Sequence, residues 1–250
     1  MIVVVLVVVA VTSGGGTSGG GSNSTPLASA SVLRQIEGVS PETMATQVKN
    51  DPPLAFPAST GNTTVLMANG KPKIVYIGAE YCPYCGGERW AMIMALSKFG
   101  TFTGIKQITS SASDNPSAIP TFSFLGASYR SRYLVFDPTE TQDVNRNPLQ
   151  TPTAENAALE AKYDAPPYTQ AGGIPFVYIG GKWVIDGASY DVTPMQHLSH
   201  ATVAQAAATG STKYGSDIQA TAGAIVSRLC NLTHGQPGNV CRSFPAVVGK

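Results

Sequence analysis

The chain has few charged residues. Lys, Arg, Asp and Glu make up 12% of its 250 residues, about half the share of an ordinary soluble protein. The net charge is +1, and no run of Lys or Arg occurs. Such a surface does not build the positive field that nucleic acids or anionic membranes require. We therefore expect no nucleic-acid partner.

Cysteines are also scarce, with four in two close pairs, Cys82/Cys85 and Cys230/Cys241. This pattern indicates two dithiol or disulfide units. The segment between Cys230 and Cys241 contains Gly and Pro, so it can loop back. We expect a structural disulfide there, stabilising the fold by about 3 kcal/mol. A second redox pair stays open, whereas a metal site with His234 lacks a fourth ligand.

The sequence lacks an apolar run long enough to cross a bilayer, which takes about 20 residues. Ile2–Val11 is purely apolar but shorter. We interpret residues 1–12 as a secretory signal or the tail of a membrane anchor, the alternative being a buried strand. The Gly/Ser-rich residues 13–26 then form a flexible tether. The expected location is extracytoplasmic, either membrane-anchored or secreted, with membrane contact only through the N-terminal segment.

The folded part is expected to begin near Leu27. Residues 27–60 are predicted to form an N-terminal extension with one short helix, which begins with Ser40 as N-cap and Pro41 at the first helical position. A buried strand at 73–78, a helix ending before Gly100 and a strand at 105–109 follow. They predict a βαβ unit with a parallel strand pair.

The remainder of the chain is interpreted as one continuous domain reaching residue 250. Residues 110–172 are predicted to be an insertion between core strands, because they are rich in Pro, Ser, Thr and Asn. Further elements are expected as strands at 121–125 and 133–136, a helix at 154–162, a hairpin of 176–179 with 183–185, and helices at 195–208 and 216–229. The part from about 209 onward is a C-terminal helical extension.

The motif Cys82-Pro83-Tyr84-Cys85 lies between the predicted strand and helix. A helix N-terminus stabilises a thiolate, lowering its pKa from about 8.5 into the range of roughly 3.5–7.5. We expect Cys82 to be the exposed nucleophile and Cys85 the buried resolving thiol. Zinc would need about four ligands, and a structural disulfide across two residues is strained. No metal or other cofactor is therefore expected.

Two segments resemble the thioredoxin superfamily. Ala79-Glu80-Tyr81-Cys82 resembles the family's Ala-Glu-Trp-Cys, and Gly173-Ile174-Pro175 resembles its Gly-Ile-Pro, in which the proline is cis and faces the redox pair. The resemblance covers roughly residues 65–110 and 172–208. It implies an α/β, thioredoxin-like fold, a mixed central sheet flanked by helices, and extra C-terminal helices. It also implies that four residues bind substrate: Pro83, Tyr84, Ile174 and Pro175.

The sequence departs from thioredoxin at Tyr76, where the family has a buried Asp that accepts a proton from the resolving thiol. Glu80, Tyr84 or water must then accept that proton if the enzyme reduces substrates. The long insertion resembles that of the periplasmic disulfide oxidoreductases of bacteria. The chain is also similar to an uncharacterised thioredoxin-like family, domain of unknown function 929.

These features predict a thiol–disulfide oxidoreductase that acts on protein thiols or disulfides of exported proteins, together with an unidentified redox partner. Its direction as oxidase, reductase or isomerase stays open, because all three use the same residues and differ in reduction potential. One alternative is a non-catalytic binding module with a thioredoxin fold. The other is a glutaredoxin-like, glutathione-dependent reductase, since glutaredoxins also use Cys-Pro-Tyr-Cys.

Two smaller patterns carry weaker expectations. His197 and His200 are spaced to chelate a metal from one helix, although a solvated pair is the more ordinary interpretation. Asn23, Asn62 and Asn231 begin Asn-x-Ser/Thr sequons, which matter only in a glycosylating host.

Overall fold

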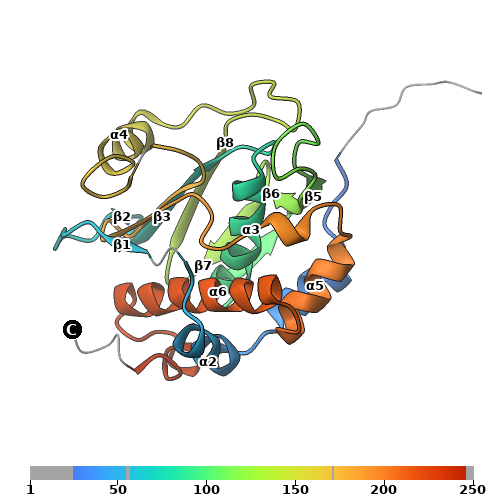
Figure 1. The fold of residues 1–250 in the computed structure, drawn as a ribbon. Coiled ribbons are helices and arrows are strands. Elements are labelled where there is room, and N and C mark those ends of the chain that lie inside the picture. Colours follow the sequence, from blue (N-terminus) through green and yellow to red (C-terminus); the bar gives the residue numbers. More distant parts are fainter. Residues whose placement is uncertain (1–24, 55–56, 171, 246–250) are drawn as a thin grey trace, which may run out of the picture.

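The computed structural model describes residues 25–54, 57–170 and 172–245. Within these ranges the chain forms a mixed α/β structure (Figure 1). The helices are α1 (Ala30–Glu37), α2 (Pro41–Asn50), α3 (Pro83–Leu96), α4 (Ala154–Tyr163), η1 (Thr193–Met195), α5 (His200–Thr209), α6 (Lys213–Leu232) and α7 (Gly238–Cys241). The strands are β1 (Ala58–Ser59), β2 (Met67–Ala68), β3 (Lys71–Gly78), β4 (Gly100–Thr103), β5 (Lys106–Thr109), β6 (Pro120–Ser123), β7 (Ser128–Ser131), β8 (Val135–Glu140), β9 (Phe176–Ile179) and β10 (Trp183–Asp186).

The main sheet is mixed, in the order β1-β10-β9-β3-β2, with β8 also paired to β3. Strand β8 runs parallel to β3, from Lys73 opposite Val135 to Gly78 opposite Glu140. The hairpin of β9 and β10 was predicted correctly, and β9 lies antiparallel to β3. The sheet therefore brings the carboxyl ends of β3 and β8 to the same edge.

The predicted pairing of the 105–109 strand with β3 is wrong. Strand β5 pairs with β6 in a separate two-stranded sheet, and β4 pairs with β7 in another. In β5 only Ile108 is buried, so this strand suits a partly exposed hairpin. The parallel partner of β3 is β8, which the sequence interpretation had assigned to the insertion. Residues 110–172 are thus not one insertion, because they contain a core strand.

Alternation along β3 explains why the sheet is covered on both faces. Ile74 and Tyr76 point into the larger core, which α3 and α6 complete, whereas Val75 and Ile77 belong to a smaller cluster. Leu159 and Tyr163 of α4 pack on that smaller cluster. Figure 1 shows α4 on one side of the sheet, with α3 and α6 on the other. A strand buried on both faces reads as a continuous apolar run.

The helices differ from the predictions mainly at their ends and in number. The N-terminal extension has two helices, α1 and α2, where one was expected; α2 has the predicted Ser40 cap, whose Oγ accepts from the Thr43 amide. Helix α3 ends at Leu96, before the expected boundary, and Gly100 already starts β4. Helix α6 packs on α2, α3 and α5, so it is part of the core and not an appended extension.

The predicted signal or anchor at residues 1–12 and most of the tether lie outside the described residues, as does Asn23. In the described ranges, none of the helices combines the length and hydropathy needed to cross a membrane. Location therefore remains an expectation from sequence.

Candidate redox site

Helix α3 begins at the Cys-Pro-Tyr-Cys motif. Strand β3 ends at Gly78, a short turn follows, and Cys82 is the N-cap of α3 with Pro83 at the first helical position. The Cys82 sulfur accepts a hydrogen bond from the backbone amide of Cys85 at 3.2 Å. This amide is one of the unpaired donors of a helix N-terminus. The sequence thus forms a cap in which a sulfur atom takes the place of the usual oxygen.

The predicted exposure of Cys82 is wrong. The residue is 4% exposed, and Cys85 is fully buried. Tyr81 and Ile174 pack against the two cysteines, and the Arg146 guanidinium lies 3.8 Å from the centre of the Tyr81 ring. The neighbouring Tyr84 is 45% exposed. The motif therefore reaches the surface through Tyr84, while Cys82 is covered by Tyr81 and Ile174.

The two motifs that are far apart in sequence meet in the structure. The Cys82 thiol lies 3.5 Å from the carbonyl oxygen of Ile174, to which it can donate. The Ile174–Pro175 bond is cis, as the resemblance implied. The loop of Gly173, Ile174 and Pro175 is anchored by a hydrogen bond from the Gly173 amide to Asp164 Oδ2 at 2.7 Å. The thioredoxin resemblance had implied that this loop faces the cysteine pair, and the Cys82–Ile174 contact agrees with it.

The two thiols have opposite electrostatic surroundings. A hydrogen bond with Cys85, and then the amide contacts at the helix N-terminus and the nearby Arg89, hold the pKa of Cys82 below its usual range. Burial, and then the hydrogen bond with Cys82, raise the pKa of the Cys85 thiol well above its usual range. The pair can thus present one reactive thiolate and one protonated partner.

A groove runs beside the pair. Its volume is about 610 Å³, and it lies between α4 and the segments that cover Cys82. Its lining includes Ile77, Tyr81 and Ile174 on one side and Glu160 and Asp164 on the other. An extended polypeptide placed in this groove would contact Tyr81 and Ile174, the two residues that cover Cys82. Its volume lies within the range of about 300–1,000 Å³ that is ordinary for ligand sites.

Sequence reasoning missed a buried ion pair behind the cysteines. Arg89 and Glu140 are both fully buried. The Arg89 side chain donates from Nε to Glu140 Oε1 at 3.0 Å and from Nη2 to Glu140 Oε2 at 2.6 Å. Nη2 also donates to the Ala79 carbonyl at 2.7 Å, three residues before Cys82. The available signal was a pair of adjacent charged residues, Glu88 and Arg89, within an otherwise apolar helix.

Tyr76 stands at the position of the missing Asp, and Glu80 and Tyr84 are the side chains that were expected to accept the proton in its place. The Tyr76 side chain is buried, and its hydroxyl has no hydrogen-bond partner among the described residues. Glu80 is also buried, and its Oε1 accepts from Ser123 Oγ at 2.6 Å. Glu80 is therefore engaged elsewhere, and Tyr84 points to the exposed side of the helix.

Residues 60–171 match the family model described as domain of unknown function (DUF929). This match supports the similarity to domain of unknown function 929 that was expected from sequence, and not the thioredoxin resemblance; it covers Cys82 and Cys85 but ends before the Ile174–Pro175 loop. No curated protein matches the chain, and no solved structure does.

The second cysteine pair forms a disulfide. Cys230 at the end of α6 and Cys241 in α7 are bonded, with their Cα atoms 5.5 Å apart. Both residues are buried in the main core. The structural role expected from sequence fits this position, in which the disulfide holds α7 against α6.

The two histidines do not form the predicted helical pair. His197 lies before α5 with a positive φ of 58°, and only His200 is helical. The His200 Nε2 lies 2.8 Å from the carbonyl oxygens of Ile108 and Thr121, whereas His197 lies by Ser117. In the described ranges, no three His, Cys, Asp or Glu side chains gather as metal ligands would.

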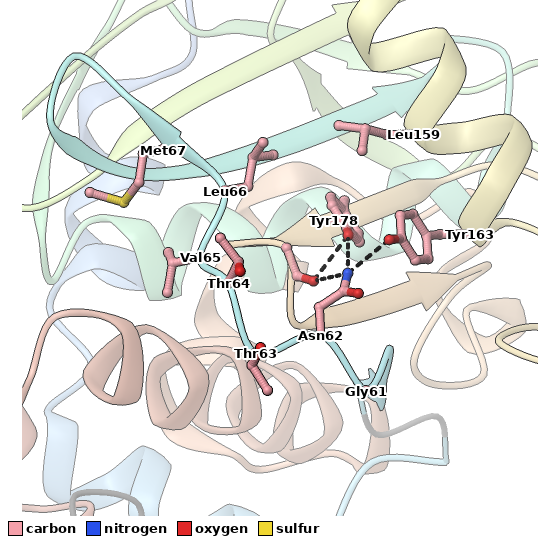
Figure 2. A pocket seen from close by; sticks show the side chains of 11 residues that line it. Gly61, Asn62, Thr63, Thr64, Val65, Leu66, Met67, Leu159, Tyr163 and Tyr178 are labelled. Atoms are coloured by element: carbon pink, nitrogen blue, oxygen red, sulfur yellow. Dashed lines mark hydrogen bonds between the residues drawn. The ribbon is translucent and has the colours of Figure 1, made fainter.

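A second cavity, of about 500 Å³, lies on the other side of α4 (Figure 2). Asn62 points into its wall, where its Nδ2 lies 2.8 Å from the Tyr163 hydroxyl, 3.1 Å from the Tyr178 hydroxyl and 2.8 Å from the Gly181 carbonyl (Figure 2). The sequon at Asn62 is thus engaged in the folded structure. Its amide ties the 60–64 segment to α4 and to the β9–β10 turn.

Proposed function

We propose that this protein is a thiol–disulfide oxidoreductase with a thioredoxin-like fold, and that Cys82 and Cys85 are its redox pair. One observation carries the proposal. Cys82 caps a buried helix while its thiol contacts the carbonyl of Ile174, beside a cis proline contributed by a distant part of the chain. A helix N-terminus activates the thiol, and the loop offers backbone groups to a substrate.

The exchange follows from the two thiols. The Cys82 thiolate attacks one sulfur of a substrate disulfide, and the other substrate sulfur leaves as a thiolate. The Cys85 thiol then attacks Cys82 Sγ, and its proton passes to the second substrate sulfur, which leaves as a thiol. Two electrons pass from the protein dithiol to the substrate, and the protein keeps the Cys82–Cys85 disulfide. The same steps in reverse oxidise a substrate dithiol.

Other features support this proposal without deciding the fold family. The central sheet is mixed and has helices on both faces. The redox pair follows the carboxyl end of β3, the strand between β8 and β9. The apolar N-terminal segment and the Cys230–Cys241 disulfide favour an oxidising compartment, and we therefore propose an extracytoplasmic location for the protein.

The test is a pair of single substitutions. Cys82→Ser should abolish turnover in an insulin-reduction or RNase-refolding assay, because no nucleophile remains. Cys85→Ser should trap mixed disulfides through Cys82, which mass spectrometry detects under non-reducing conditions. The matched control is Cys230→Ala with Cys241→Ala, which should keep turnover. Full activity in both single variants would refute the proposal.

One observation favours a second candidate, a thioredoxin-fold binding module without catalysis. Cys82 is covered by Tyr81 and Ile174 and is 4% exposed. Alkylation of the reduced protein with iodoacetamide across a pH series separates the two candidates. An enzyme should react with a pKa below about 8.5, whereas a binding module should react slowly and with an unshifted pKa.

A further inference from the structure

The space behind the redox pair contains buried donors that lack acceptors. Arg89 is fully buried, and its Nη1 has no hydrogen-bond partner among the described residues. The Tyr76 hydroxyl is also buried and has no hydrogen-bond partner among the described residues. The Arg89 Cζ lies 5.7 Å from the centre of the Tyr76 ring. Leaving a buried donor unpaired costs about 1–3 kcal/mol, so a negative charge that formed near these two neighbouring side chains would be stabilised.

Helix geometry aims the guanidinium at the cysteines. Arg89 follows Cys85 by four residues on α3, so the two side chains share one face. Helical side chains also lean toward the N-terminus. The Arg89 Nη2 reaches the Ala79 carbonyl at 2.7 Å, and Ala79 packs in one cluster with Cys82 and Cys85. The positive charge therefore lies beneath the pair, inside the protein.

The charge is held in place by its counter-ion. Glu140 lies at the end of β8, opposite Gly78 in the parallel ladder. Both its oxygens accept from Arg89, and Oε1 also accepts from the Phe124 amide at 3.1 Å. The bidentate fork fixes the plane of the guanidinium. A second carboxylate, that of Glu80, lies near Glu140. Glu80 accepts a hydrogen bond from Ser123 Oγ.

We propose that Arg89 is a positioning residue that stabilises the thiolate form of the Cys82–Cys85 pair and so makes its disulfide more oxidising. The proposal rests on the redox function proposed above. A thiolate gives the guanidinium an acceptor, and a disulfide does not. Stabilising the reduced, ionised form raises the reduction potential of the pair. Tyr76 does not act as the base, because burial raises the pKa of its hydroxyl well above its usual range and the hydroxyl therefore keeps its own proton.

The first variant removes the ion pair as a unit. Arg89→Met alone would leave Glu140 buried and unpaired, which risks loss of the fold. The double variant Arg89→Met, Glu140→Leu avoids this. Its Cys82 pKa should rise by about 1 unit. Its equilibrium constant with glutathione should shift about tenfold toward the protein disulfide, about 30 mV more negative. Iodoacetamide alkylation and glutathione titration of the full chain measure both.

A second variant gives the opposite sign. Glu140→Gln keeps one acceptor for Arg89 but removes the negative charge, so the Cys82 pKa should fall. The matched control is Lys73→Met at the other end of β3, because Lys73 is also a buried cation and is paired with Asp137 at 3.1 Å. It should lower stability and leave the Cys82 pKa unchanged.

The outcomes are distinct. Opposite pKa shifts in the double and Glu140→Gln variants, with none in Lys73→Met, support the positioning role. An unchanged Cys82 pKa in the folded double variant overturns it, even if the enzyme is active. If the pKa shifts appear but wild-type Cys82 gives no turnover, the proposed enzyme function fails while the electrostatic role of Arg89 stands.

Discussion

Two neighbouring residues of α3 show opposite ways of burying charge. Arg89 is paired with Glu140 and donates three hydrogen bonds, two to Glu140 and one to the Ala79 carbonyl. Glu88 is equally buried but has no cation partner in the described part of the chain. Its Oε2 accepts from the Ser189 amide at 3.0 Å, and its Oε1 has no partner there. Burial raises the pKa of Glu88 to about 7.

This shift predicts a pH-dependent stability. In the unfolded chain Glu88 loses its proton near its ordinary pKa of 4.5, whereas in the folded protein it keeps it until about 7. The folded state binds more protons between these values, so the free energy of unfolding falls as pH rises through this window. The loss is on the order of 3 kcal/mol. Glu88→Gln should remove this decline.

Urea unfolding of the wild-type and Glu88→Gln proteins at about pH 5 and about pH 8 measures this change in the free energy of unfolding. The variant should be the more stable protein at the higher pH. Glu155→Gln is the control, because its carboxylate is largely exposed. An equal loss of stability with pH in wild type and Glu88→Gln would contradict the assignment.

At the scale of elements, the first turns of α3 pack closely against neighbouring segments at two glycines, Gly86 and Gly87. A Cβ on Gly87 would lie 2.2 Å from Val192 Cγ1, whereas one on Gly86 would lie 3.3 Å from Ile119 Cγ2. The Gly86 carbonyl also accepts from Thr121 Oγ1 at 2.7 Å. These contacts determine how deeply the start of α3, and with it Cys82, sits in the fold.

Gly87→Ala should therefore destabilise the protein by about 1–3 kcal/mol, because overpacking at Val192 exceeds the gain in helix propensity. Gly86→Ala is the matched control and should cost distinctly less. Chemical denaturation measures both. A stabilised Gly87→Ala variant, or equal losses in the two, would show that α3 moves to accommodate a methyl group.

At the scale of the whole molecule, the C-terminal part encloses the core. The 20 residues of α6 pack on three other helices, and the Cys230–Cys241 bond ties α7 to its end. The disulfide closes a loop of 11 residues. Such a loop contributes about 3 kcal/mol in the chain-entropy model.

Cys230→Ala with Cys241→Ala should lower the free energy of unfolding by about 3 kcal/mol. The pKa and turnover of Cys82 should not change, because the disulfide lies in the helical core and not at the redox pair. Denaturation with and without reductant measures the first effect. A change in Cys82 reactivity would instead favour the open alternative of two exchanging redox pairs.

Local chemistry was predictable from sequence. The cis bond before Pro175 was implied only by the family resemblance, whereas the cap at Cys82 and Pro83 and the β9–β10 hairpin each follow from a few adjacent residues. The α2 cap at Ser40 was predictable for the same reason. Such features depend on backbone preferences that act over one turn, so the amino acids alone determine them.

Pairings between distant segments were decided by the tertiary structure. The sequence could not show that β8, and not β5, lies beside β3, because both are short strands of mixed polarity. Nor could it show that Arg89 meets Glu140, or that Tyr81 and Ile174 cover Cys82. These contacts depend on which buried faces fit together, and that fit is a property of the packed core rather than of any one segment.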